Sequence, residues 1–319
     1  MRLFFLLITT IFLLTTALSY PQNGEFIKNL YSNYLKGLYH MEKGEYTRAL
    51  QSLERAKAAD PESIHIRLKI ATAFIRLKEF GKAERELKEA KEIDPDNLDL
   101  SLALIFVYSY LQKDEELEKE YGYFLKKAHE LKPANTNISG YLAQFYFYKQ
   151  KPREAIKVYE KILESNPEHI DAIFWLGYLY SDTGEIDKAI EIWERGLRIN
   201  PNYGPILNSL GYTYAQQGAN LQRAKELIVR ALEAEPENGA YLDSLGWVYY
   251  KEGNLEKAKK YLEKAVKNIE DPEVYEHLGD LYIRLGSVEK GLEYYKKGLK
   301  NFPKNKSLKE KVEKYEERN

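Results

Sequence analysis

The chain has 319 residues, and its 48 lysines and arginines against 49 aspartates and glutamates leave a net charge close to zero. This balance argues against a nucleic-acid partner, because such partners select strongly basic surfaces. The chain contains no cysteine, which excludes a disulfide framework and the attachment of a lipid to a cysteine. The fold must therefore be held together by side-chain packing.

The first nineteen residues have the pattern of a secretory signal peptide. An uncharged run over residues 3–18 follows a positively charged start, and Ala17 and Ser19 are small residues at the positions that a signal peptidase reads. We expect cleavage after Ser19 and export of the mature chain, which begins at Tyr20, to the periplasm or cell envelope. The alternative is that residues 1–19 stay attached and anchor the chain to the membrane.

The mature chain is expected to have no transmembrane span. The uncharged run holds about sixteen residues, fewer than the roughly twenty that a helix needs to cross a bilayer. Residues 20–29, which follow it, are predicted to be a linker between the signal peptide and the rest of the chain.

Residues 30–303 repeat with a period of about thirty-four. One register position recurs in eight units and is small in all but the third, at Gly37, Ala71, Ile105, Ala143, Gly177, Gly211, Gly246 and Gly279. Within one unit, apolar residues fall three and four apart over residues 172–181 and 187–199, which is the spacing of amphipathic helices. Glycine in the polar turn between them, such as Gly184, suits a helix end. The array therefore predicts an all-α fold, an α-α solenoid or superhelix of about eight helix-turn-helix hairpins.

Two segments depart from the regular pattern. In the third unit, the bulky Ile105 and Tyr121 occupy the small positions, and four extra residues fall around positions 112–118. We expect a longer turn there and a splayed hairpin. Residues 304–319 have apolar residues four and three apart among charged ones, which predicts a capping helix that covers the last apolar face.

The repeated unit resembles the tetratricopeptide repeat family over residues 30–303. One unit has Leu176-Gly177, Tyr180, Ala189, Trp193, Gly196 and Pro201 at the spacing of that family. Residues 238–247 are also similar to segments of long bacterial tetratricopeptide proteins of the cell envelope. The resemblance implies that a partner binds along a concave groove lined by the first helix of each hairpin.

The same resemblance implies that the residue after each small position points into this groove. In three consecutive units these residues are aromatic, namely Tyr178, Tyr212 and Trp247. Together with neighbours on the same helical faces, the candidate binding residues are Phe174, Tyr178, Asn208, Tyr212, Asp243, Trp247, Tyr250 and Asp280. The competing interpretation is that these aromatic residues pack against the adjacent repeat as part of the core.

No pattern of catalytic, cofactor or metal chemistry occurs along the chain. The five histidines are scattered and have no metal-ligand spacing. Nucleotide-binding loops and nucleophile elbows are also missing from the sequence. We therefore expect a protein without a cofactor, a metal or enzymatic activity.

Three functional hypotheses remain. The first is a scaffold or adaptor of the bacterial cell envelope that binds a protein or peptide partner in the groove. The second is a carbohydrate-binding accessory protein of polysaccharide export or cell-wall metabolism, in which aromatic rings stack on sugars. The third is an enzyme with a site that no motif identifies.

Overall fold

The computed structural model describes residues 24–218 and 220–316. Over these residues the chain forms 17 helices and no strand, as the sequence predicts. The predicted signal peptide, the first four residues of the predicted linker and the last three residues of the predicted capping segment lie outside the described residues.

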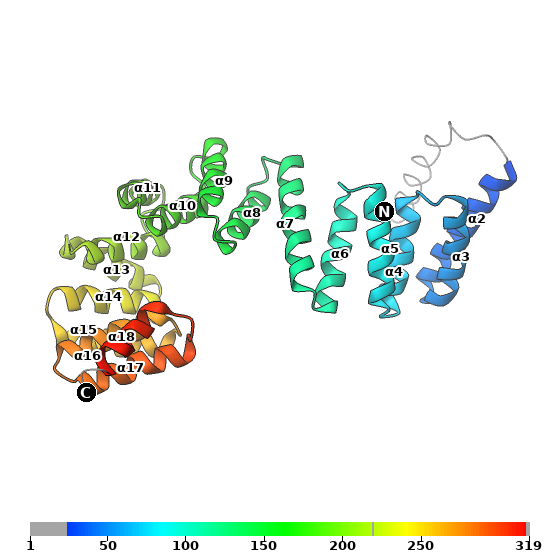
Figure 1. Cartoon of the computed structure of the whole chain (residues 1–319). Coiled ribbons are helices and arrows are strands. Elements are labelled where there is room, and N and C mark those ends of the chain that lie inside the picture. The colour runs from blue at the N-terminus through cyan, green and yellow to red at the C-terminus, as the bar shows by residue number, and fades with distance from the viewer. Residues whose placement is uncertain (1–23, 219, 317–319) are drawn as a thin grey trace. The chain divides into compact units, whose positions relative to one another are not determined.

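The chain divides into two compact units, the first ending at Pro133 and the second beginning at Ala134. Figure 1 shows the helices as successive hairpins in each unit. Unit 1 contains three hairpins, made by α2 (Gly24–Glu42) with α3 (Tyr46–Ala59), α4 (Ile64–Arg76) with α5 (Phe80–Ile93), and α6 (Leu98–Leu111) with α7 (Asp114–Leu131).

Unit 2 contains five hairpins and a final helix. The hairpins are α8 (Thr136–Tyr148) with α9 (Pro152–Ser165), α10 (Ile170–Asp182) with α11 (Ile186–Ile199), α12 (Gly204–Gln217) with α13 (Leu221–Ala234), α14 (Gly239–Lys251) with α15 (Leu255–Asn268), and α16 (Pro272–Arg284) with α17 (Val288–Asn301). The final helix is α18 (Lys306–Glu316).

The turns inside the hairpins use the left-handed backbone conformation. Gly184 and Gly253 have φ values of 81° and 80°, as the polar turns of the sequence predict. Lys78 and Gln112 take the same conformation without being glycine, at φ values of 60° and 55°. The hairpin geometry therefore imposes a backbone that side chains disfavour, because Cβ crowds the backbone at positive φ.

The two helices of a hairpin approach most closely at the small positions. A Cβ atom added to Gly246 of α14 would lie 2.7 Å from Cγ and 3.1 Å from the backbone nitrogen of Leu262 on α15. Leu262 is itself fully buried. A larger residue at position 246 would therefore have to push the helices of this hairpin apart.

The third hairpin differs from the prediction made for it. Only two residues separate α6 from α7, so the predicted long turn is wrong. The four extra residues instead lengthen α7 to 18 residues, against 14 in α5 and α9. Tyr121 is exposed and Gly122 is buried. The small residue of this helix is therefore Gly122, one position later than the repeat register indicates.

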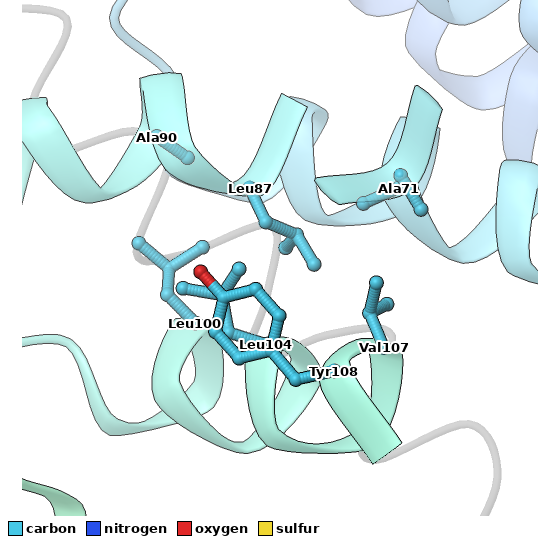
Figure 2. Packing of buried hydrophobic residues seen from close by; sticks show 8 residues of the cluster. Ala71, Leu87, Ala90, Leu100, Leu104, Val107 and Tyr108 are labelled. Carbon is cyan, nitrogen blue, oxygen red and sulfur yellow. The ribbon is translucent and has the colours of Figure 1, made fainter. Parts of the chain in front are cut away.

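The core of unit 1 shows how neighbouring hairpins are joined. Figure 2 shows Leu87 and Ala90 of α5 facing Leu100 and Leu104 of α6, the first helix of the next hairpin. All four side chains are buried. At about 25 cal/mol per Å² of apolar surface, burial between hairpins is the main stabilising contribution in a repeat array.

Helix α18 packs on the last hairpin of unit 2. Its Leu308 and Val312 are buried in a cluster with Tyr275 and Tyr295. On the other side, the Lys311 ammonium lies 2.5 and 2.6 Å from the two carboxylate oxygens of Asp280 on α16. The helix therefore covers apolar surface of α16 and α17 and presents charged residues outward.

Two glycines of unit 2 give a matched test of the close-approach argument. We expect Gly246→Ala to lower the free energy of unfolding by about 1–3 kcal/mol, the usual effect of overpacking. Gly140 lies in the interior of α8 with no atom within 4 Å of an added Cβ. Gly140→Ala should therefore stabilise by about 0.5–1 kcal/mol, because alanine loses less backbone entropy in a helix. Denaturant unfolding of both variants measures the difference, and equal effects would refute the steric explanation.

Candidate functional site

The predicted binding residues lie on the first helices of four consecutive hairpins in unit 2. Helix α12 contacts α10 and α14, and α14 contacts α16. We call the surface that these four helices share the α10–α16 face. It carries Phe174 and Tyr178 on α10, Asn208 and Tyr212 on α12, Asp243, Trp247 and Tyr250 on α14, and Asp280 on α16.

Tyr178 is the most accessible of the predicted aromatic residues, with 38% of its surface exposed. Its ring meets that of Phe147 edge-on at 5.6 Å and that of Trp175 at 5.8 Å. Phe174 extends the cluster, because its ring lies 5.3 Å from Trp175. Sequence reasoning missed Trp175, which lies one position after Phe174 and outside the register used to choose candidates.

Trp247 stacks on two other rings. Its ring stacks on Tyr250 at a centroid distance of 4.7 Å and on His277 at 3.9 Å, with interplanar angles of 7° and 14°. Only 7% of its surface is exposed, and its Nε1 has no hydrogen-bond partner. Trp247 therefore joins α14 to α16 as part of the core, which is the competing interpretation of the aromatic series.

His277 forms a buried pair with Asp243. Its Nδ1 lies 2.9 and 3.0 Å from the two carboxylate oxygens of Asp243, one repeat earlier in the chain. Burial alone would lower the pKa of His277, but the negative charges of Asp243, Glu273 and Asp280 and the hydrogen bond to Asp243 raise it above its ordinary value. The predicted site residue Asp243 is therefore buried and already paired with His277, so its carboxylate is not free to bind a partner.

Tyr212 connects α12 to α16. Its hydroxyl donates a hydrogen bond to the Glu273 carboxylate and accepts one from the Gln216 side chain. Burial raises the pKa of Glu273, although the residue keeps contact with solvent. Among the described residues, no lysine or arginine forms an ion pair with Glu273. The positive charge that acts on Glu273 is that of His277, which is itself paired with Asp243.

Two further predicted residues differ in what they can offer a partner. The Oδ1 atom of Asn208 is buried and has no hydrogen-bond partner. Asp280 accepts hydrogen bonds from Tyr295 and from Lys311 of α18, so it holds the terminal helix in place. Asn208 is therefore available for a new hydrogen bond after a small movement, whereas Asp280 is not.

Negative charge gathers around the exposed part of this face. Burial raises the pKa of Tyr178, and the carboxylates of Asp182, Glu273 and Asp271 add to the effect. These three groups lie on α10 and at the start of α16, so negative charge from both helices acts on Tyr178. The accessible part of the α10–α16 face combines aromatic rings with carboxylates and so suits a partner with apolar and basic groups.

The helices carry neither a metal centre nor a membrane span within the described ranges. No group of three or more histidine, aspartate or glutamate side chains could hold a metal ion among residues 24–218 and 220–316. No helix in the same ranges is long and apolar enough to cross a membrane.

The fold places the chain among the solenoid proteins built from helical hairpins. Models of the tetratricopeptide repeat match residues 40–108, 147–210, 209–272 and 244–306. The matches cover more than half of the sequence, and the chain therefore belongs to the tetratricopeptide repeat family. Such repeats form protein-interaction scaffolds, and the fold is typical of non-catalytic proteins. No curated protein matches the sequence.

Solved structures of low sequence identity share the fold. A thermophilic tetratricopeptide protein of Thermus thermophilus is 22% identical, with a TM-score of 0.51, over 56% of this chain and 98% of its own. The APC/C hetero-tetramer Cut9-Hcn1 is 15% identical, with a TM-score of 0.56, over 85% of this chain and 52% of its own. The human IFIT1 dimer with PPP-AAAA is 17% identical, with a TM-score of 0.51, over 88% of this chain and 71% of its own.

The buried pair of His277 and Asp243 predicts a pH dependence of stability. The pKa of His277 is higher in the folded than in the unfolded chain. Its contribution is therefore fully present below the unfolded value of about 6.5 and is lost as pH rises through the folded value. We expect the free energy of unfolding to fall as pH rises over the range above about 6.5, and the fall to be smaller in His277→Gln. Denaturant titrations across this range measure it, and the same decline in both proteins would contradict the assignment.

Proposed function

We propose that the protein is a non-enzymatic adaptor that binds an extended segment of a protein or peptide along the α10–α16 face. The observations that carry the proposal are the exposed Tyr178 ring, packed with Phe147 and Trp175, and the Glu273 carboxylate on the same face, which accepts a hydrogen bond from Tyr212 and pairs with no lysine or arginine of the described residues. A face that offers both an accessible aromatic ring and a carboxylate favours arginine or lysine side chains, through cation–π attraction and a charge-assisted hydrogen bond.

Carbohydrate binding is the second candidate function. It would use flat aromatic rings as platforms for sugars, and Tyr178 has the exposed surface for this role. Trp247 does not fit it, because the residue is buried and its ring already stacks on Tyr250 and His277. Of the three residues predicted to stack on sugars, Tyr178 is exposed, Tyr212 is half-buried and Trp247 is buried. This supports a peptide over a polysaccharide as the partner.

We further propose that the adaptor works outside the cytoplasm, in the periplasm or cell envelope. The support is the charged start, the uncharged run and the small residues Ala17 and Ser19, all of which lie outside the described residues. The repeats contain no cysteine, so the fold does not depend on the redox state of the compartment.

Tyr178→Ala tests the binding face with little risk to the fold, because the side chain is partly exposed. We expect it to weaken capture of the native partner by roughly thirtyfold, or about 2 kcal/mol, while the melting temperature changes little. Glu273→Gln should weaken capture of a basic peptide but leave capture of a neutral polysaccharide unchanged.

Tyr148→Ala provides the matched control, because Tyr148 is an exposed tyrosine of the same unit outside the α10–α16 face. It should leave capture unchanged. Trp247→Ala is a poor probe, since emptying a buried aromatic site costs about 3–5 kcal/mol of stability. If neither Tyr178→Ala nor Glu273→Gln weakens capture of the partner, the binding site does not lie on the α10–α16 face.

Export is tested on the native protein. We expect amino-terminal sequencing to return Tyr20 as the first residue and cell fractionation to find the protein outside the cytoplasm. A chain that starts at Met1 and fractionates with membranes would favour the anchored alternative. A cytosolic chain that starts at Met1 would refute export.

A further inference from the structure

Helix α6 of unit 1 is apolar around most of its circumference. Asp99 is its only charged residue. One side packs in the core, where Figure 2 shows Leu104, Val107 and Tyr108 directed toward α5. A helix that is apolar on all sides is usually buried on all sides. The remaining side of α6 is therefore the feature that needs an explanation.

Three large side chains stand on that remaining side. Leu102, Phe106 and Tyr110 are spaced four residues apart, so they follow one face of the helix. Their surfaces are 49%, 43% and 60% exposed. We call these three residues the unit 1 stripe. Contiguous apolar surface of this kind on a soluble protein marks an interaction site.

The stripe continues onto α5 through ring contacts. The ring of Phe80 stacks on that of Tyr110 with 4.4 Å between centroids and 18° between planes. Phe106 lies 5.0 Å from Tyr110 and 6.5 Å from Phe80. The three rings therefore form one continuous surface, and stacking fixes the position of the exposed Tyr110.

A hollow adjoins these rings. It is lined by Lys78, Glu79, Phe80, Gly81, Lys82, Arg85 and Leu111. Phe80 belongs to both the ring cluster and the hollow, so the two features are continuous. Gly81 presents no side chain, and an added Cβ would meet nothing within 4 Å. This leaves open space next to an aromatic wall, large enough for a side chain of a partner.

The charge of the hollow is mainly positive and only partly compensated. Lys82 pairs with Glu79 at 2.6 Å. Lys78 and Arg85 are exposed, and no carboxylate of the described residues lies within ion-pair distance of either. The other cations of unit 1 that pack between helices are neutralised, as Lys57 and Arg67 are by Glu86 and Lys113 is by Glu84. The acidic first turn of α7 does not contribute to the lining.

We propose that the unit 1 stripe and the adjoining hollow form a second docking site, which takes a segment of a partner protein that carries acidic residues beside an apolar anchor. The anchor packs against Phe106 and Tyr110, and the acidic residues pair with Lys78 and Arg85. The site is independent of the α10–α16 face, which lies in the other unit and has the opposite charge.

Selection of random linear peptides displayed on phage against the full-length protein tests this site. We expect enriched sequences that place aspartate or glutamate beside leucine, isoleucine or phenylalanine. Binding of a labelled enriched peptide, followed by fluorescence anisotropy, should weaken at least tenfold, about 1.4 kcal/mol, in the double variant Phe106→Ala with Tyr110→Ala. The double variant Lys78→Glu with Arg85→Glu should weaken it by a similar factor, and added salt should weaken binding to the wild type.

Two control variants separate this site from general stickiness and from the α10–α16 face. Tyr148→Ala removes another exposed tyrosine, and Lys132→Glu reverses another exposed lysine of unit 1; both should leave binding unchanged. Tyr178→Ala should also leave binding of this peptide unchanged. The experiment therefore tests the unit 1 site independently of the proposed function of the α10–α16 face. Absence of acidic peptides among the enriched sequences, or binding of an acidic peptide that neither double variant weakens, would overturn the proposal. Circular dichroism melting of each variant excludes unfolding as the cause of a loss.

Discussion

The close approach of two helices at a small residue is the contact on which this molecule depends. In α14 and α15 it brings the backbone at Gly246 against Leu262, and there is no room for a Cβ atom. Gly37, Gly177, Gly211 and Gly279 make the same kind of contact in four other hairpins, so these hairpins have similar dimensions and can stack in a regular series. The stacked first helices then form the surfaces that a partner could reach. Packing inside a hairpin thus determines where functional side chains lie.

Much of this architecture could be predicted from the sequence, because the repeat period of about thirty-four residues determines the succession of hairpins. The period identifies the hairpins, and the turn glycines identify their ends. The third unit was harder, since four extra residues can lengthen a turn or a helix and the period does not distinguish the two. The charged run over residues 114–120 extends α7 because glutamate and lysine are good helix formers.

The candidate site was predictable in its helices but not in the roles of its residues. The register placed Trp247 correctly on α14, yet its burial depends on His277, which belongs to the next repeat. His277 and Asp243 are 34 residues apart, one repeat length, so a search for ionisable pairs at the repeat period would have found them. Asp280 looked available until the structure placed Lys311 of the terminal helix against it. Contacts between repeats decide which groups remain free.

All three tryptophans of the chain, Trp175, Trp193 and Trp247, belong to unit 2. Unit 1 contributes tyrosine and phenylalanine to the absorbance of the protein but no indole. Emission excited at the red edge of the absorption band therefore reports on unit 2 alone, whereas circular dichroism averages the helices of both. The two signals would coincide on unfolding if the units melt together and separate if they melt apart. Because tryptophan occurs only in unit 2, the intrinsic fluorescence and the circular dichroism of the unlabelled protein together measure whether the two units unfold cooperatively.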